Sequence, residues 1–238
     1  MKTLSIIIPV YNEAKTIAIV LDKLIALRIT GDLHKEIVII DDASADGTAE
    51  AIAPYLQQEF HGCTFQFHRH LQNSGKGAAL QAGFSLCTGD VAVIQDADLE
   101  YDPSDINRLV QPVLDGYADV VYGSRFISQS PHRVLYYWHR FGNKLLTELS
   151  NMFSNINLTD METGYKLFRS DVVKKLQLRE KKFGIEPEMT AKISKIKNIR
   201  IYEVGISYFG RTYVEGKKIG WKDGLRALYC IFRYNIFN

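Results

Sequence analysis

The chain has 238 residues, of which 46% are hydrophobic and 24% charged, a composition that excludes a disordered protein and allows one sizeable core. The net charge of +2 hides an asymmetry, because residues 1–159 carry 12 Lys and Arg against 18 Asp and Glu, whereas residues 160–238 carry 17 against 9. The basic C-terminal third predicts an anionic partner: phosphate groups, an anionic membrane surface or nucleic acid.

Short apolar runs alternate with segments of helical periodicity over the first half of the chain. Residues 4–10 predict a buried strand, followed by a turn and a helix over about 14–27. Further strands are predicted at 36–40, 65–69, 91–94 and 119–122, with helices ending near 56, 86 and 114 between them. Because parallel strands need crossover helices, this order predicts an α/β fold, Rossmann-like, with a mostly parallel central sheet and helices on both faces.

Acidic residues follow the most apolar of these strands, which ends at residue 94. Asp96, Asp98 and Glu100 stand at alternating positions where ligands bind in open α/β sheets. Two carboxylates separated by one residue can face one hard cation, which bridges substrate phosphates. The same acids are also compatible with a solvated turn that caps the next helix, since Ser104 and Asp105 suit its first turn.

Two other segments resemble ligand loops only in part. Residues 42–47 resemble the start of a calcium loop, but the twelfth position is Ala53 and not Glu, which argues against calcium. The Gly75-Lys76-Gly77 turn lacks the complete pattern of a phosphate-binding loop. It favours either an anion at a helix N-terminus or a tight strand-to-helix turn.

The second half changes character. An aromatic amphipathic helix is predicted over 134–153, which either packs on the core or lies in a membrane interface. A turn into a strand follows over 160–169, and then come helices over 171–176 and 189–196 and a long strand or strand pair over 199–208. The loop at 210–218 combines glycines with three cations and is suited to closing over phosphates. The apolar face of 225–237 is too short to span a bilayer but long enough to lie on one.

The cysteines and the hydropathy pattern point to a reducing compartment. Cys63, Cys87 and Cys230 are widely spaced and odd in number, which indicates neither a disulfide framework nor a zinc site. No signal peptide and no spanning helix are predicted. We expect a cytoplasmic protein, with peripheral binding at the cytoplasmic membrane face.

Five short motifs follow the predicted strands in order: Pro9-x-Tyr11-Asn12-Glu13, Asp41-Asp42-x-Ser44-x-Asp46-Gly47-Thr48, Asn73-x-Gly75-Lys76-Gly77, Asp96-Ala97-Asp98 and Gly123-Ser124-Arg125. Together they resemble the inverting family two glycosyltransferases, and most of all the dolichol-phosphate mannose synthases and relatives that make polyprenyl-phosphate sugars. The resemblance covers residues 3–222.

The resemblance implies a GT-A type fold, with a nucleotide-sugar-binding half at 1–130 and an acceptor-side half at 131–238 in one continuous catalytic domain. It implies donor-binding roles for Pro9, Tyr11, Asn12, Glu13, Asp42, Lys76, Asp96 and Ala97. Mg²⁺ or Mn²⁺ would be held by Asp96, Asp98 and Glu100, the last of which stands where the mannose synthases often have Gln. Catalytic roles fall on Asp98, Arg125, Arg211 and Lys218, and acceptor-binding roles on Arg125, Arg140, Asp160 and Arg211.

The function predicted from this resemblance is transfer of a hexose, mannose or glucose, from a GDP-mannose or UDP-glucose type donor to a polyprenyl phosphate. A phosphate acceptor is ionised at neutral pH, with a second pKa of about 6, and needs no general base. The alternative is transfer to a glycan or small-molecule hydroxyl, which needs a base, for which Asp160 and Glu188 are the candidates. A non-catalytic module that binds anions or membranes would also explain the basic third, whereas no nucleic-acid-binding motif is present.

Overall fold

The structure is a computed structural model that describes residues 1–127, 134, 136–210 and 220–237. Up to residue 124 the elements are β1 (Thr3–Val10), α1 (Ile17–Ala26), β2 (His34–Asp41), α2 (Thr48–Leu56), β3 (Cys63–Arg69), α3 (Lys76–Leu86), β4 (Val91–Ile94), η1 (Pro103–Asp105), α4 (Ile106–Leu114) and β5 (Val120–Ser124). The later elements are α5 (Tyr137–Ser154), β6 (Lys166–Arg169), α6 (Ser170–Val173), α7 (Ile185–Ser194), β7 (Ile201–Gly205) and α8 (Trp221–Ile236).

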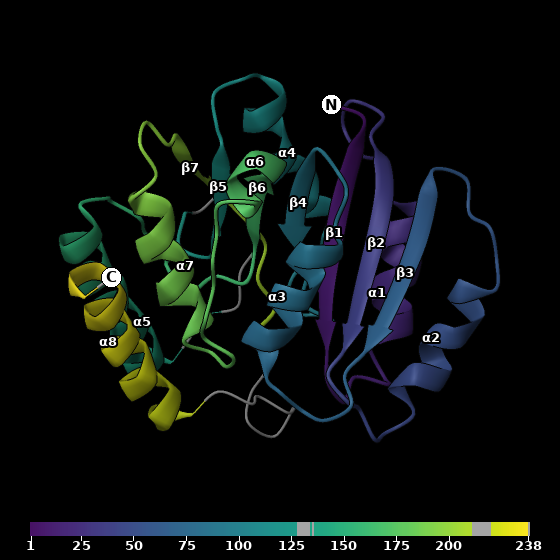
Figure 1. Cartoon of the computed structure of the whole chain (residues 1–238), viewed down its shortest axis with the longest axis horizontal. Helices are drawn as coiled ribbons and strands as arrows, with labels where there is room; N and C mark the ends of the chain where they lie inside the picture. Colours follow the sequence, from purple (N-terminus) through teal and green to yellow (C-terminus); the bar gives the residue numbers. More distant parts are fainter. Residues whose placement is uncertain (128–133, 135, 211–219, 238) are drawn as a thin grey trace.

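One seven-stranded sheet runs through the molecule in the order β3-β2-β1-β4-β6-β5-β7 (Figure 1). Every pair is parallel except those of β6, which is antiparallel to both β4 and β5. The predicted mostly parallel α/β sheet is therefore confirmed. Strand β6 comes from the second half of the chain and lies between two strands of the first half, so the two halves share one sheet.

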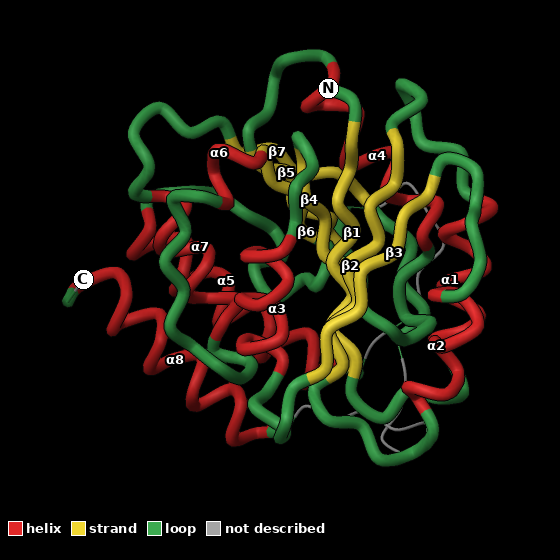
Figure 2. The backbone as a smooth tube through the Cα atoms, turned by 45° about the vertical axis from the view of Figure 1, so that its right-hand side comes forward, coloured by secondary structure: helices red, strands yellow, loops and turns green. Residues whose placement is uncertain are grey.

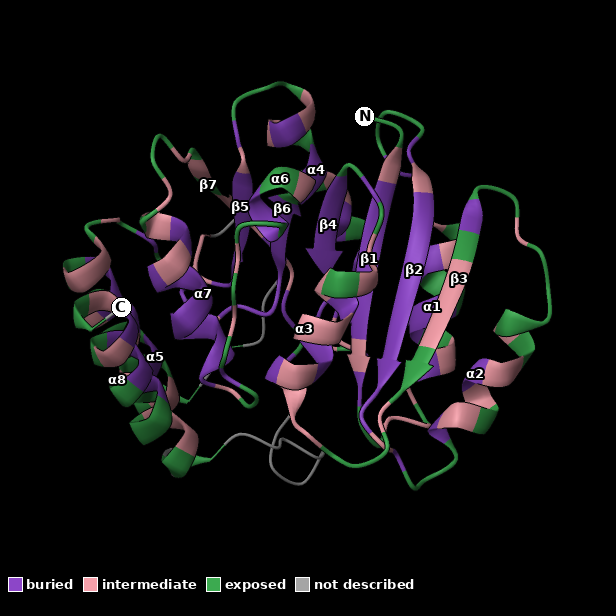
Figure 3. Cartoon of the chain, in the orientation of Figure 1, coloured by how far each residue is buried: buried purple, intermediate pink, exposed green. Residues whose placement is uncertain are grey.

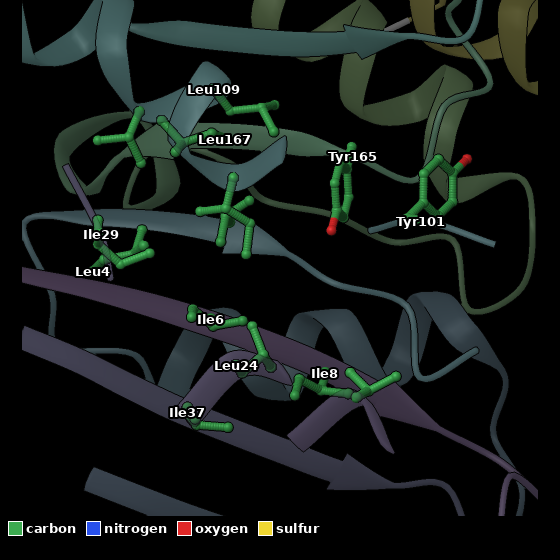
Figure 4. Close-up of a cluster of buried hydrophobic side chains, with 14 of the residues drawn as sticks. Leu4, Ile6, Ile8, Leu24, Ile29, Ile37, Tyr101, Leu109, Tyr165 and Leu167 are labelled. Carbon is green, nitrogen blue, oxygen red and sulfur yellow. The ribbon is translucent and has the colours of Figure 1, made fainter. Parts of the chain in front are cut away.

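Helices cover both faces of this sheet, with α1, α2 and α4 on one face and α3, α5, α7 and α8 on the other (Figure 2). Successive side chains of a strand point to opposite faces, so Ile6 and Ile8 of β1 enter one core while Ile7 enters the other. In Figure 4, Ile6 and Ile8 lie near Leu24 of α1 and Ile37 of β2. The central strands are buried on both faces, as their nearly continuous apolar sequences predict (Figure 3).

Helix α3 approaches β1 closely because Gly83 has no side chain. A Cβ at Gly83 would overlap Cγ2 of Ile7, a fully buried residue. Gly142 of α5 is a matched control, because a Cβ there meets no atom of the described residues within 4 Å. We expect Gly83→Ala to lower the free energy of unfolding by about 1–3 kcal/mol through overpacking.

The control change Gly142→Ala should raise the free energy of unfolding by about 0.5–1 kcal/mol, because alanine loses less backbone entropy in a helix. Urea denaturation followed by circular dichroism measures both effects. Equal stability of the two variants would contradict the close packing of α3 on β1.

Several predicted boundaries were wrong, among them those of α7, β7 and α6. Helix α7 begins at Ile185 and not at 189, because Pro187 falls in its first turn, where no backbone donor is lost to the helix. Strand β7 is a single strand over Ile201–Gly205, shorter than 199–208. Helix α6 spans Ser170–Val173 and is shorter than the helix predicted over 171–176.

The amphipathic helix predicted over 134–153 exists as α5, but the aromatic side chains of its first two turns are exposed, whereas Phe153 near its end packs against the core. Trp138 is 77% exposed and Met152 is 66% exposed. The buried face of α5 is polar. Asn151 Nδ2 donates a hydrogen bond to the carbonyl of Leu158 at 2.8 Å, and Asn151 Oδ1 accepts one from the N–H of Leu158 at 3.0 Å. These hydrogen bonds to the loop after α5 fix which face of the helix turns inward.

No helix among the described residues is long and apolar enough to cross a membrane.

Candidate active site

A cavity of about 500 Å³ opens at the carboxyl ends of β1, β2, β4 and β5. Its volume is in the range of small-ligand sites, and its position is the one expected for an open α/β sheet. Most of the predicted site residues line it, namely Pro9, Tyr11, Glu13, Asp42, Lys76, Asp96, Ala97, Asp98, Glu100 and Arg125. The fold therefore brings together five motifs that are spread over more than 100 residues of sequence.

The turn after β4 holds the two central carboxylates at the cavity. Asp98 accepts a hydrogen bond from the backbone N–H of Glu100 at 3.0 Å, which fixes the turn. Asp96 lies 2.8 Å from the ammonium group of Lys76. Glu100 accepts a hydrogen bond from the Tyr208 hydroxyl at 3.0 Å.

These acids do not form a cluster of three metal ligands, and none is found in the described part of the chain. The predicted third ligand, Glu100, lines the cavity and accepts a hydrogen bond from Tyr208 through Oε2. A pair of carboxylates still suits Mg²⁺ or Mn²⁺, which in nucleotide sites is bound by one or two carboxylates together with waters and the phosphates of the substrate. Asp96 and Asp98 fit that role.

Lys76 begins helix α3 and places a cation beside the Asp96–Asp98 turn. Burial alone would lower its pKa, but the nearby carboxylates of Asp96 and Glu186 outweigh burial and raise the pKa of Lys76. The amine is therefore charged at neutral pH. Its place at the N-terminus of α3 supports the anion-binding interpretation of the Gly75-Lys76-Gly77 turn.

The turn after β1 is braced by the loop after β2. Asn12 has a positive φ of 52°, its N–H donates to Ser44 Oγ at 2.9 Å, and its side-chain oxygen accepts from Ala45 N–H at 2.9 Å. Asn12 thus supports the turn from behind and does not line the cavity, unlike its neighbours Tyr11 and Glu13.

Asp42 lines the cavity, but its carboxylate oxygens accept hydrogen bonds from other residues of the protein. It is 2% exposed, and its carboxylate accepts from the N–H groups of Ser74 at 2.9 Å and Gly75 at 2.7 Å. His70 Nδ1 lies 2.7 Å from the same carboxylate. Asp42 therefore holds the turn that carries Lys76 against the end of β2.

Arg125, just after β5, is held by a buried ion pair. Its Nε lies 2.6 Å from Asp160 Oδ2 and its Nη2 lies 2.7 Å from Asp160 Oδ1, a two-point contact. Burial opposes the charge of Arg125, but Asp160 more than compensates and raises its pKa. Asp160 is fully buried and lies outside the cavity lining, so its role in the structure is to orient Arg125.

The remaining predicted residues lie elsewhere. Arg140 is exposed on α5, with its guanidinium over the ring of Phe126 at 5.6 Å, and it does not line the cavity. Glu188 is fully buried and accepts from the N–H groups of Arg179 and Glu180. Arg211 and Lys218 lie outside the described residues.

Sequence reasoning missed several residues of the cavity wall. Glu162, Gly164 and Glu186 line it, although only Asp160 of the 160–164 segment was singled out. Burial, followed by the negative charge of Glu186, raises the pKa of Glu162 to about 7. The sequence did contain a signal for this wall, namely the two acids Asp160 and Glu162 followed by Gly164, shortly before β6.

Comparison with known families decides the class of protein. The model of the family described as "Glycosyl transferase family 2" matches residues 5–177, which include β1 to β6 and the Asp96–Asp98 turn. The chain belongs to glycosyl transferase family 2. This family 2 glycosyltransferase has residues of all five predicted motifs at the cavity, and the family predicted from the sequence is confirmed.

Relatives extend the match over most of the chain. An uncharacterized protein of Methanocaldococcus jannaschii is 26% identical over 98% of this chain and 92% of its own length. Undecaprenyl-phosphate 4-deoxy-4-formamido-L-arabinose transferases are 26% identical in Aeromonas hydrophila, over 91% of this chain, and 33% identical in Pseudomonas savastanoi, over 73% of this chain. The chain covers 63% and 49% of the lengths of these two transferases.

Solved structures share the fold. Glucosyl-3-phosphoglycerate synthase from Mycobacterium tuberculosis, in complex with Mn²⁺, UDP-glucose and phosphoglyceric acid, superposes with a TM-score of 0.72 at 17% identity. The match covers 98% of this chain and 79% of that one. The predicted GT-A type fold is therefore confirmed.

Proposed function

We propose that this family 2 glycosyltransferase transfers a hexose from a nucleotide sugar of the GDP-mannose or UDP-glucose class to a polyprenyl phosphate, with inversion at the anomeric carbon. The observation that carries the proposal is the pair of carboxylates, Asp96 and Asp98, in one cavity with the cations Lys76 and Arg125. Relatives that are named for transfer to undecaprenyl phosphate support the acceptor class.

In this proposal the donor lies across the cavity, with its nucleoside near Tyr11 and Glu13 and its diphosphate at the Asp96–Asp98 turn. Mg²⁺ or Mn²⁺ held there would neutralise negative charge on the diphosphate as it leaves. Lys76 and Arg125 add fixed positive charge on the same wall, where a low dielectric strengthens their effect.

The reaction then needs no proton transfer. An anionic oxygen of the acceptor phosphate forms a bond to the anomeric carbon while the bond from that carbon to the diphosphate oxygen breaks, and the electron pair leaves with the nucleoside diphosphate. Arg125 at the cavity, with Arg211 and Lys218, supplies the cations that we assign to the acceptor phosphate, whereas Arg140 lies outside the cavity lining and is not assigned to it. Both base candidates for a hydroxyl acceptor, Asp160 and Glu188, lie outside the cavity lining, which favours the phosphate acceptor.

The test is a product assay. The purified protein is incubated with Mn²⁺, a short polyprenyl phosphate and, in turn, UDP-glucose and GDP-mannose, and lipid-linked sugar is identified by mass spectrometry. We expect a prenyl-phosphate hexose from one donor. Formation of product with a prenyl alcohol or a glycan, and not with the phosphate, would instead support the hydroxyl-acceptor alternative.

We also propose that the protein binds the membrane surface through the α5–α8 face, defined as the exposed apolar side chains Tyr137, Trp138, Phe141, Leu145 and Met152 of α5 and Leu225, Tyr229, Phe232 and Ile236 of α8. The two helices lie side by side (Figures 1 and 3), and Phe153 contacts Phe232, with ring centroids 4.9 Å apart. Aromatic side chains beside cations such as Arg140 and Lys144 are typical of helices that lie in a lipid interface.

The double change Phe141→Glu and Tyr229→Glu should weaken sedimentation with phosphatidylglycerol-containing vesicles by about tenfold or more, because two apolar anchors are lost. The matched control is Leu56→Glu, which alters a leucine of α2 that is 40% exposed. Equal vesicle binding by the two variants would refute the membrane role of the α5–α8 face.

A further inference from the structure

Two carboxylates of the cavity wall have no part in the mechanism above. Glu162 lies in the loop before β6, and Glu186 lies in the first turn of α7. Both line the cavity together with Gly164 and Lys76. They come from segments more than 20 residues apart, so tertiary folding and not local sequence brings them to one wall.

Within the described part of the chain, each of these carboxylates has one buried oxygen without a hydrogen-bond partner, Oε1 in both cases. Glu186 is only 3% exposed, and its Oε1 lies 3.6 Å from Lys76 Nζ, too far for a hydrogen bond. Buried polar atoms are almost always satisfied, and both residues line the same cavity, so we take a ligand in that cavity as the missing donor.

The protein fixes the direction of Glu186. Its other oxygen, Oε2, is ion-paired with Lys166, a fully buried lysine that also donates to the carbonyl of Thr163. This pair anchors α7 to the start of β6, while Oε1 of the same carboxylate takes no part in it. An anchored carboxylate loses little entropy when it accepts a hydrogen bond from a ligand.

The wall adjoins the proposed diphosphate site. Lys76 Nζ lies between Asp96 Oδ1, at 2.8 Å, and Glu186 Oε1, at 3.6 Å. Gly164 permits close packing here, because a Cβ at this position would overlap Asp96 Oδ2. A group attached to a diphosphate at the Asp96–Asp98 turn would therefore lie against Glu162 and Glu186.

The charges of the wall favour neutral hydrogen-bond donors over a cation. Asp96 and Glu186 are balanced by Lys76 and Lys166, and burial raises the pKa of Glu162 to about 7, so that this carboxyl is only partly ionised at neutral pH. Hydroxyl groups are neutral donors, and a hexose presents several on adjacent carbons.

We propose that Glu162 and Glu186 form the sugar-recognition wall of the donor site and accept hydrogen bonds from hydroxyl groups of the hexose that is transferred. This inference rests on the proposed function, because it assumes a nucleotide-sugar donor. It assigns the choice of sugar to these two residues and predicts that donors lacking the matching hydroxyl group are poor substrates.

The test separates the sugar from the nucleotide. Calorimetry with Mn²⁺ compares the affinity of UDP and GDP with that of UDP-glucose and GDP-mannose, in the wild type and in Glu162→Met. We expect unchanged nucleoside diphosphate affinity and a loss of about tenfold to a hundredfold in nucleotide-sugar affinity. Glu162→Gln, which keeps an acceptor oxygen, should recover part of this loss, and Glu148→Gln, an exposed position on α5, should show none.

Monodeoxy donors provide the second arm. A donor that lacks the recognised hydroxyl should bind the wild type weakly and should lose no further affinity in Glu162→Met. Unchanged nucleotide-sugar affinity in Glu162→Met would overturn the inference, and so would a fall in kcat alone, which would indicate a general base. If neither UDP nor GDP binds the wild type, the proposed function itself fails, and the inference fails with it.

Discussion

Replacing Asp98 by asparagine is expected to lower kcat for sugar transfer by roughly a thousandfold, since a metal that neutralises leaving-group charge contributes several kcal/mol to the transition state. Asparagine keeps an oxygen that can accept from the N–H of Glu100, so the turn after β4 should keep its shape. The variant should therefore melt at the same temperature as the wild type while losing its response to added Mn²⁺.

Turnover is measured with saturating donor and acceptor over a series of Mn²⁺ concentrations, with EDTA as the metal-free reference. Asp171→Asn is the matched control, because Asp171 is exposed and pairs only with Arg169 at the surface in the described structure. Wild-type turnover by Asp98→Asn, or full activity in EDTA, would contradict the metal role of the Asp96–Asp98 turn.

The second large effect is expected on stability. Changing Asp160 to asparagine leaves the guanidinium of Arg125 buried without a countercharge, and removing one partner of a buried ion pair costs about 3–5 kcal/mol. Arg125 should also lose its orientation at the cavity, so that transfer activity falls together with the free energy of unfolding.

A double-mutant cycle measures the interaction energy between Arg125 and Asp160 separately from the contacts that each makes with other residues. Arg125→Met combined with Asp160→Asn should be more stable than the sum of the two single effects predicts, because no unpaired cation remains. The exposed pair Arg28–Asp32 serves as the control, since loss of a surface ion pair leaves stability almost unchanged. Urea denaturation of the variants measures the coupling, and strictly additive effects would argue against a specific Arg125–Asp160 interaction.

The part of the site on the parallel strands could be predicted from sequence. Residues 91–94 are entirely apolar and the acids begin at Asp96. The sequence alone therefore locates both the end of this strand and the acids of the candidate site that follow it. The same holds for the turn after β1, where Tyr11 and Glu13 line the cavity as expected. The local pattern did not separate these residues from Asn12, whose side chain braces the turn instead.

The rest depended on tertiary contacts. The strand at 160–169 was expected, but its antiparallel insertion between β4 and β5 was not, because Lys166 interrupts the apolar pattern. Lys166 can be fully buried only because Glu186, twenty positions later, provides its countercharge. Likewise, the aromatic stripe of α5 is visible in the sequence, whereas its exposure follows from the polar contacts of the opposite face.

The most direct measurement is anomalous diffraction at the manganese edge from crystals soaked with Mn²⁺ and either UDP-glucose or GDP-mannose. We predict one manganese peak at the carboxylates of Asp96 and Asp98, bridged to the diphosphate of the nucleotide sugar, with the sugar ring against Glu162 and Glu186. A diphosphate bound away from the turn after β4, with no manganese at either aspartate, would contradict the account.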